Sequence, residues 1–467
     1  MKIAFHGAAR TVTGSKHLIT LSNGKKLLLD CGMFQGMGSE TNELNKNFGF
    51  NPADVDYMVL SHAHIDHCGL VPKLVKDGYK GKIYATPATK ELAALLMEDS
   101  AGIQENDVKF ENKRRALQGL PYLQPLYTTE DALIAVDSFV TKEYNYWFKI
   151  DNDIECCFTD AGHIIGSACV HLRINENGKK KHITFSGDVG RYRDVILKSP
   201  EKFEQANAII MESTYGNSLH DEHHPTPETL LEWINKTCLQ KKGKLIIPAF
   251  SVGRTQELLF ALNQLELENK LPALEYFVDS PLSSKSTLLI KQYPQYFNAR
   301  IQKILQKDED PFAFKGLKFT KSVDESKMLN YYRNPCVIIS ASGMAEAGRI
   351  KHHISNNIEN SRNTILFTGY CEPNSLGGRL MRRPNEVSIF GQVHEVNAEI
   401  GEMRSMSAHG DYEDLMQWLA CQNPKEVEKF FLVHGEYDVQ QDLRQRLVRK
   451  GFLDVEIPER HQEIGLG

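Results

Sequence analysis

The sequence predicts an α/β protein in which one α/β domain is split by a second, inserted α/β domain. Three observations support this fold class. Short apolar runs alternate with segments of helical pattern along most of the chain. After about residue 212 the pattern changes from hairpins and loops to regular strand–helix units. The chain of 467 residues also exceeds the roughly 250–300 residues at which a single hydrophobic core stops growing.

The first 212 residues are expected to supply strands that end at polar positions or turns. Such apolar runs occur at 26–30, 57–61, 183–186 and 208–211. Segments 18–29 and 170–184 each carry an Asn-Gly turn between two apolar runs, which favours antiparallel hairpins. The polar stretch 88–131 is predicted to be a helical excursion from the domain.

From about residue 213 to 395 each predicted strand is followed by a helix. The expected pairs are strand 244–250 with helix 253–265, strand 274–280 with helix 283–292, and strand 335–340 with helix 345–354. Repeated units of this kind favour a parallel sheet. A helix at 412–421 and a strand at 429–433 would return to the first domain. The expected boundaries are 1–212 and 396–467 for the outer domain and 213–395 for the insertion.

Composition narrows the class of protein. Contents of 41% hydrophobic and 25% charged residues are ordinary for a globular protein. No apolar run approaches the roughly 18 residues of a membrane helix, and no signal-peptide pattern opens the chain, so a cytoplasmic protein without a membrane partner is expected. Nine scattered cysteines without a C-x-x-C pair indicate buried, reduced thiols. The net charge of −5 argues against a general nucleic-acid coat but permits a local phosphate-binding site.

The strongest local signal is an H-x-H-x-D-H pattern, formed by His62, His64, Asp66 and His67 directly after the strand at 57–60. Two histidines that lie two residues apart on extended backbone point the same way, so both imidazoles can reach one ion. Asp66 and His67 turn with the chain and can serve a second ion. Imidazole with carboxylate suits zinc, although manganese or iron would also accept these ligands. A histidine-rich surface loop is the alternative interpretation.

A metal site of this kind needs ligands from elsewhere in the chain, and four residues stand in suitable places. They follow predicted strands or precede a turn: Asp30, His163, Asp188 and His434. Each of them alone would more often be structural or exposed than a ligand. Two further histidine pairs, His223-His224 and His352-His353, are expected to be exposed and without metal.

In this order the residues resemble the motif set of the metallo-β-lactamase superfamily. Three more segments resemble its β-CASP branch, which includes the nucleases of the cleavage and polyadenylation factor and ribonuclease J type. They are Glu212-Ser213-Thr214-Tyr215-Gly216, Ser405-Met406-Ser407-Ala408-His409-Gly410-Asp411 and Leu432-Val433-His434-Gly435-Glu436. The resemblance covers nearly the whole chain, and it implies an αββα sandwich with an inserted β-CASP domain.

The resemblance also implies a role for each motif residue. The first zinc would be held by His62, His64 and His163, and the second by Asp66, His67 and His434. Asp188 would bridge both ions, and Asp30 would fix a ligand histidine by a hydrogen bond. The catalytic residues would be Asp66, His409 and Glu212, with Glu212 keeping His409 protonated as the general acid.

The expected reaction is hydrolysis of a phosphodiester in RNA by a hydroxide that bridges two metals, endonucleolytic rather than exonucleolytic. Two divalent ions, two carboxylates and one hydroxide leave a small net positive charge, which suits a phosphate anion. Metals about 3.5–4 Å apart can activate a shared water and stabilise the charge that develops on the phosphate. RNA is the expected partner, with DNA as an alternative substrate, and a homodimer is compatible with the sequence.

The inserted domain is expected to contribute the substrate contacts. Ser342 and Gly343 lie between a predicted strand and helix, where backbone N–H groups can hold a phosphate. Tyr370 and Arg379 would line the same wall, although a tight turn explains each glycine of this region equally well. After Tyr370 the chain reads Cys371-Glu372-Pro373-Asn374-Ser375, where relatives commonly carry Glu-Gly-Thr, so the grip on substrate departs from the family pattern.

Two other functions compete with the ribonuclease. A hydrolase of a small-molecule ester or lactone would leave the insertion and the pairing of Glu212 with His409 unexplained. A non-catalytic RNA-processing subunit would not need a complete ligand set.

Overall fold

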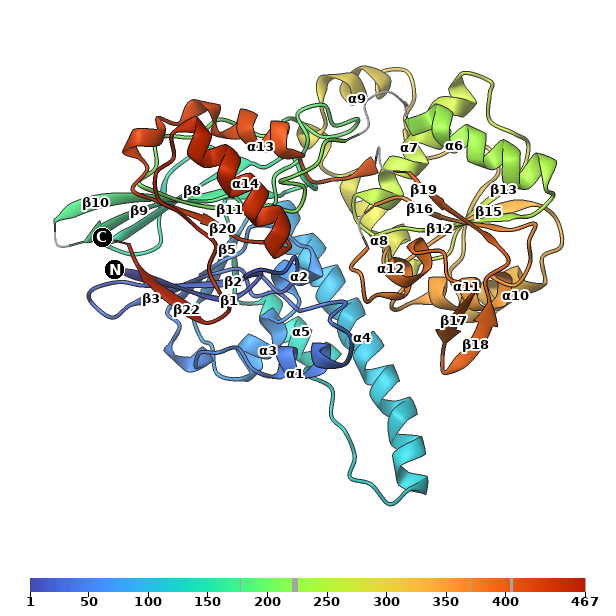
Figure 1. Ribbon diagram of the computed structural model, residues 1–467, viewed down its shortest axis with the longest axis horizontal. Coiled ribbons are helices and arrows are strands. Elements are labelled where there is room, and N and C mark those ends of the chain that lie inside the picture. The colour runs from blue at the N-terminus through green and yellow to red at the C-terminus, as the bar shows by residue number, and fades with distance from the viewer. Residues whose placement is uncertain (177, 221–225, 370, 404–405, 467) are drawn as a thin grey trace. The chain divides into compact units, whose positions relative to one another are not determined.

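The computed structural model describes residues 1–176, 178–220, 226–369, 371–403 and 406–466. The chain forms two compact units (Figure 1). The first comprises Met1–Gln35, Ser39–Leu219 and His409–Gly467, and the second comprises Gly36–Gly38 and His220–Ala408.

These boundaries lie several residues beyond the expected ones. Residues 213–219 stay with the first unit, where Tyr215 forms a parallel β-bridge with Asp411. At the other end, the strand β19 (Glu399–Glu402) pairs with β16 (Thr364–Phe367) and so belongs to the insertion. Both differences arise from pairing between strands that are distant in sequence, which local patterns do not specify.

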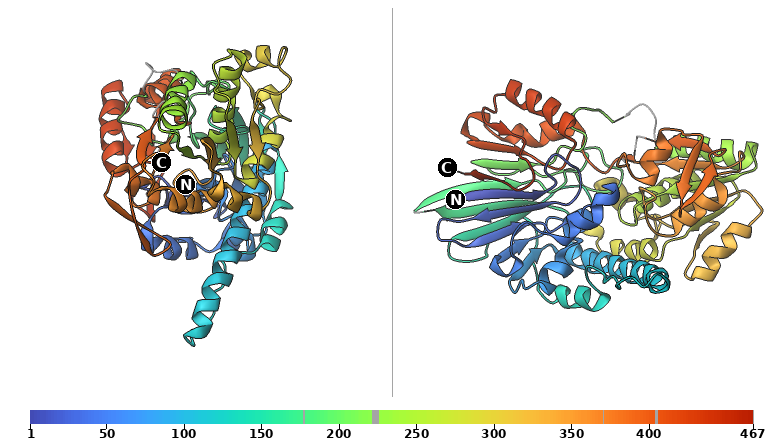
Figure 2. Two further views of the ribbon diagram at one scale, coloured as in Figure 1. Left: turned by 90° about the vertical axis from the view of Figure 1, so that its right-hand side faces the viewer. Right: turned by 60° about the horizontal axis from the view of Figure 1, so that its bottom comes forward.

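Two seven-stranded sheets pack face to face in the first unit (Figure 2). In order across the first sheet the strands are β22 (Gln462–Gly465), β1 (Lys2–Gly7), β2 (Lys16–Thr20), β3 (Lys26–Leu29), β4 (Tyr57–Val59), β5 (Lys82–Ala85) and β6 (Phe139–Thr141). The second sheet contains β21 (Val455–Glu456), β20 (Lys429–Leu432), β11 (Ala208–Met211), β10 (Lys179–Phe185), β9 (Ala168–Glu176), β8 (Ile154–Asp160) and β7 (Phe148–Lys149).

Both predicted hairpins are present. β2 pairs with β3, and β9 pairs with β10, in antiparallel register. Gly24, in the first turn, has φ of 86°, a left-handed conformation that glycine adopts without strain. The turn position at residue 177 lies outside the described residues.

The core of the first unit lies between the two sheets, where inward-facing side chains alternate with outward-facing ones. Phe5, Leu29 and Val59 from the first sheet meet Phe158 and Phe185 from the second. Helices cover the outer faces and complete an αββα sandwich (Figure 1). The helices are α1 (Thr41–Lys46), α3 (Val71–Lys76), α4 (Pro87–Leu117) and α5 (Thr129–Val136) beside the first sheet, and α13 (Tyr412–Trp418) and α14 (Tyr437–Lys450) on the second.

The inserted unit is built on a six-stranded, wholly parallel sheet, as the repeated strand–helix pattern predicts. Its order is β14 (Leu317–Phe319), β13 (Glu275–Val278), β15 (Cys336–Ser340), β12 (Lys244–Pro248), β16 and β19. The helices are α6 (Thr226–Ile234), α7 (Arg254–Leu267), α8 (Pro281–Ile290), α9 (Ala299–Ile304), α10 (Val323–Tyr331), α11 (Arg349–Asn357) and α12 (Leu376–Met381). A hairpin, β17 (Glu386–Ile389) with β18 (Gln392–Glu395), completes it.

The predicted thiols are free, and eight of the nine cysteines are buried. The prediction that His352 and His353 are both exposed is wrong for one of them. His352 is exposed, but His353 is buried, and its Nε2 lies 2.6 Å from Asp279 Oδ2. His223 and His224 lie outside the described residues. Within the described part of the chain, no helix combines the length and apolar character needed to cross a membrane.

Candidate metal centre

The H-x-H-x-D-H segment begins where β4 ends. His62 and His64 precede the short helix α2 (Ile65–Cys68), and His64 is its N-cap residue with extended backbone. The loop after β3 holds α2 in place, because the backbone N–H of Cys31 donates to His67 O at 2.8 Å. A Cβ atom at Gly32 would lie 1.5 Å from Asp66 O. Only glycine therefore permits this close approach.

Three histidines and one carboxylate oxygen form the first ligand set. His64 Nδ1 lies 3.2 Å from His62 Nε2 and 3.1 Å from His163 Nε2. Asp188 Oδ2 lies 3.3 Å from His62 Nε2 and 3.5 Å from His163 Nε2. His163 follows β8 and Asp188 follows β10, so the second sheet delivers half of the set to histidines delivered by the first.

The second ligand set surrounds the other carboxylate oxygen of Asp188, Oδ1. His67 Nε2 is 3.1 Å from His434 Nε2, and His434 Nε2 is 3.3 Å from Asp66 Oδ2. Asp188 Oδ1 is 3.3 Å from His67 Nε2 and 3.6 Å from His434 Nε2. The two sets therefore share one carboxylate, which turns a different oxygen toward each.

Both sets have the chemistry and spacing of a divalent metal site. Ligand atoms about 2.0–2.1 Å from a tetrahedral ion lie about 3.3 Å apart, close to the spacings within each set. Asp188 Oδ1 is buried without a hydrogen-bond partner among the described residues, an arrangement that a cation would satisfy. Burial lowers the pKa of His62 to about 3 and that of His64 to about 4, so both stay neutral and ready to bind a metal.

Buried polar neighbours orient the ligand histidines. Asp30 Oδ2 lies 2.6 Å from His67 Nδ1, and Asp30 also accepts the backbone N–H and hydroxyl of Ser61, each at 2.8 Å. Thr214 Oγ1 lies 3.0 Å from Nδ1 of His434, whose φ is 51°. These contacts at Nδ1 leave Nε2 of each ring directed at the second set.

His409 and Glu212 lie beside the metal-ligating candidates. His409 Nδ1 is 3.0 Å from Glu212 Oε1 and 3.9 Å from Asp188 Oδ2. The Glu212 carboxylate is fully buried, and it accepts the backbone N–H groups of Val189 at 2.7 Å and Thr214 at 3.2 Å. Burial lowers the pKa of His409, but the carboxylates of Glu212 and Asp188 more than offset this, so the pKa rises to about 9.

The expected substrate contacts belong to the inserted unit. The helix expected from 345 begins at Arg349 instead, and the backbone N–H of Ser342 donates to Ala347 O at 3.1 Å. The N–H of Ser342 is therefore used within the loop, and the phosphate contact expected from the Ser342–Gly343 segment stays a prediction. Gly343 packs against Phe250, where a Cβ would approach the ring to 2.7 Å. Arg379 lies on α12 and is partly exposed. Tyr370 lies outside the described residues.

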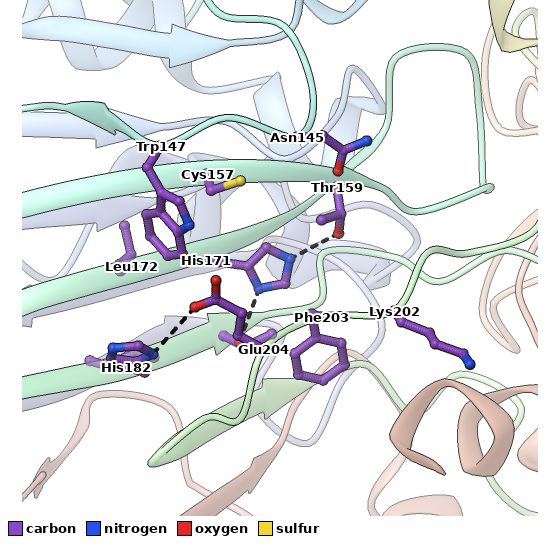
Figure 3. Close-up of a pocket in the computed structure, with 12 residues that line it drawn as sticks. Asn145, Trp147, Cys157, Thr159, His171, Leu172, His182, Lys202, Phe203 and Glu204 are labelled. Atoms are coloured by element: carbon purple, nitrogen blue, oxygen red, sulfur yellow. Dashed lines mark hydrogen bonds and ion pairs between the residues drawn. The ribbon is translucent and has the colours of Figure 1, made fainter. Parts of the chain in front are cut away.

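A separate pocket lies on the outer face of the second sheet (Figure 3). His171 forms part of its floor, and its ring nitrogens lie 2.8 Å from Thr159 Oγ1 and 3.0 Å from Thr184 Oγ1. Phe203 stacks on the same ring at a centroid distance of 5.3 Å. Because both nitrogens of His171 are engaged, this residue serves the packing of the sheet.

Comparison with known proteins agrees with this architecture. Residues 13–248 match the metallo-β-lactamase superfamily, residues 255–380 the Beta-Casp domain, and residues 393–458 the Zn-dependent metallo-hydrolase RNA specificity domain.

Three curated proteins are similar to this chain over more than nine-tenths of its length. Ribonuclease TTHA0252 of Thermus thermophilus is 34% identical over 436 residues, 93% of each chain. An RNase J-like protein of Methanocaldococcus jannaschii is 29% identical over 440 residues, 93% of this chain and 92% of that one. Transcription termination factor FttA of Methanosarcina mazei is 28% identical over 468 residues, 96% of this chain and 69% of that one. The fold, the divalent-metal ligand sets and these matches show that the chain belongs to the β-CASP branch of the metallo-β-lactamase superfamily, a family of RNA-processing nucleases.

Proposed function

We propose that the protein is a zinc-dependent ribonuclease that cleaves RNA phosphodiester bonds endonucleolytically. The observation that carries this proposal is that Asp188 turns one oxygen toward each of two ligand sets, beside the His409–Glu212 pair. A two-metal site suits the displacement of an oxygen at a phosphate, and a neighbouring proton donor suits the departure of the leaving oxygen.

In this proposal His62, His64 and His163 hold one zinc ion, Asp66, His67 and His434 hold the other, and Asp188 bridges them. Bound there, the ions supply an activated water and neutralise charge on the phosphate. Asp30 keeps the Nδ1 proton of His67 in place, which leaves Nε2 as the nitrogen that binds metal.

His409 donates the proton to the leaving oxygen. Its Nδ1–H is held by Glu212, so the proton to be transferred is the one on Nε2. The orientation of the Glu212 side chain is fixed, because two backbone N–H groups also donate to its carboxylate. Divalent cations held at the neighbouring sets would lower the pKa of His409 below the value of about 9 that it has beside the carboxylates alone, toward the range where an acid both holds and releases its proton at neutral pH. The products are a 3′-hydroxyl and a 5′-phosphate.

RNA is the proposed substrate because two similar proteins carry the names ribonuclease and RNase J-like protein, and because residues 393–458 match an RNA specificity domain. Arg379 and the Ser342–Gly343 loop are proposed to contact RNA from the inserted unit, through side chains and the remaining backbone N–H groups. The cytoplasmic location remains a prediction of the sequence.

The test uses a circular RNA and the linear RNA of the same sequence, each labelled internally. An endonuclease cleaves both, whereas an exonuclease leaves the circle intact. His409→Ala is expected to abolish most cleavage while two zinc ions remain bound, as measured by atomic emission spectrometry. His352→Ala removes an exposed imidazole and serves as the matched control. Turnover of a lactone with inert RNA, or fewer than one ion bound per chain, would refute the proposed function.

A further inference from the structure

The helix α4 has two different halves. All of its buried residues lie between Ala88 and Ala101, and none of the 16 residues that follow is buried. Figure 1 shows this second half standing out from the rest of its unit, with residues 118–128 returning beside it. We call residues 102–128 the arm.

The arm is an ordered structure rather than a frayed helix end. The side-chain amide of Asn112 accepts the backbone N–H of Leu123 at 2.8 Å and donates to Leu123 O at 2.9 Å. Arg115 Nε donates to Pro121 O at 2.7 Å. At the base, the buried Tyr127 donates its hydroxyl to Ser100 Oγ at 2.9 Å. The loop is therefore fixed against one side of the helix.

The opposite side of the helix carries an exposed apolar stripe. Ile103, Phe110 and Leu117 recur every seven residues, so they lie on one face. Phe110 is 77% exposed and Leu117 is 91% exposed. Asn112 and its loop contacts lie on the other face of the helix, so the loop does not cover the stripe. An ordered, uncovered apolar stripe marks a contact surface.

The charges beside the stripe are arranged for a second copy of this chain. Asp107 and Arg114 lie seven residues apart on the same flank, one on each side of Phe110. Arg114 also forms an exposed ion pair with Glu111 of its own helix at 2.9 Å, which Asp107 of a second copy would join. When two such helices run antiparallel about a two-fold axis near Phe110, Asp107 of each copy faces Arg114 of the other. The same operation brings Ile103 of one copy to Leu117 of the other and places the two Phe110 rings together.

We propose that the protein forms a homodimer through antiparallel pairing of its two arms, with the stripe Ile103–Phe110–Leu117 buried and two Asp107–Arg114 ion pairs formed between the copies. RNA is a poorer occupant of this surface. Two of the three stripe residues, Ile103 and Leu117, are aliphatic and offer no stacking face to a base, which leaves Phe110 as a single stacking side chain. The surface is separate from the proposed catalytic residues, so dimerisation and catalysis can be tested independently.

The test uses a charge exchange between two single variants. Asp107→Arg alone and Arg114→Asp alone each place like charges across the axis twice, so each is expected to sediment with the mass of one chain while the wild type reaches the mass of two as its concentration rises. Mixing the two variants pairs opposite charges again, and a heterodimer is expected. The double variant is likewise expected to recover the wild-type mass.

Phe110→Asp is expected to abolish the dimer by placing two carboxylates on the axis. Leu453→Asp, at another strongly exposed leucine of the same unit (81% exposed), is the matched control and should leave the dimer intact. All five variants should hydrolyse RNA at the wild-type rate per chain, which shows that they are folded. The proposal would be overturned by a wild type that has the mass of one chain at every concentration, or by a dimer that survives the single charge reversals. It would also be overturned by variants that remain dimeric but bind RNA more weakly.

Discussion

Replacement of Asp30 by asparagine tests whether a buried carboxylate sets the metal affinity of the second ligand set. Asp30 is fully buried, and its two oxygens receive four contacts: His67 Nδ1 at 2.6 Å, the N–H and the hydroxyl of Ser61 at 2.8 Å each, and the hydroxyl of Ser15 at 3.4 Å. All four partners can act as donors. A carboxylate accepts from all of them, whereas an amide offers one oxygen and one NH2 group.

Either orientation of the asparagine amide therefore fails at one side. If its NH2 faces His67, Nδ1 must accept, the proton moves to Nε2, and that nitrogen no longer binds metal. If its NH2 instead faces the backbone N–H of Ser61, this buried N–H loses its acceptor at a cost of about 1–3 kcal/mol. Such a cost corresponds to roughly 5- to 150-fold in an equilibrium constant, and it overlaps the 10- to 100-fold loss typical of changes behind a metal ligand.

The assay is competition between the protein and a chelator for zinc, followed by RNA cleavage as a function of free zinc. We expect one of the two ions to bind 10- to 100-fold more weakly, and activity to return at correspondingly higher zinc. Asp54→Asn makes the same chemical change at a carboxylate that is half exposed on the surface of the same unit and should have no effect. Unchanged affinity of both ions in Asp30→Asn would show that the hydrogen bond to His67 does not tune the site.

Three further predictions follow from single contacts. His409→Ala should lower the rate of RNA cleavage by roughly 10²- to 10⁴-fold, and a fall in bound zinc instead would show that His409 is a ligand. Trp418→Ala should destabilise the first unit by about 3–5 kcal/mol, measured by urea unfolding, because Trp418 is 1% exposed and stacks on Phe203 at 4.4 Å; an unchanged midpoint would contradict this. Burial raises the pKa of Asp279. Hydrogen bonds from His353 and from neighbouring hydroxyls lower this pKa by a larger amount, so it lies well below its usual range. The ionised Asp279 therefore stabilises the fold above its unfolded-state pKa of about 3.9, and this stability is lost as the pH falls below that value. Asp279→Asn should lower Tm at pH 7. The difference in Tm from the wild type should shrink toward pH 2.

The raised pKa of His409 shows how the fold prepares a proton donor. Glu212 directly follows β11, and His409 lies shortly before α13, so only the assembled first unit brings the two together. Burial by itself would favour neutral imidazole, and the two carboxylates reverse that preference. The proposed acid therefore depends on contacts between two parts of the first unit that the insertion separates in the sequence.

The sequence by itself determined many of the helices and strands of this protein and the family to which it belongs. Hydrophobic periodicity and Asn-Gly turns specify strands and hairpins locally, and the β2–β3 and β9–β10 hairpins and the parallel inserted sheet are where these patterns predict them. The residue types at the ends of the strands also indicated candidate ligands. His62, His163 and Asp188 come from separate segments and lie in one group of candidate ligand atoms, and His434 lies with Asp188 in another; their role as metal ligands stays a proposal.

Only the tertiary structure decided which strands pair, which polar groups are already used, and which faces remain uncovered. β19 pairs with β16, and the second boundary lies after Ala408. His353 is buried in contact with Asp279, although the local pattern predicts an exposed histidine. The hydrogen bond from Ser342 to Ala347 uses one N–H of a loop that the local pattern leaves open. The physical reason is the same in each case: burial and hydrogen-bond partners depend on residues brought together from distant parts of the chain, whereas helical and strand periodicity depends on neighbours.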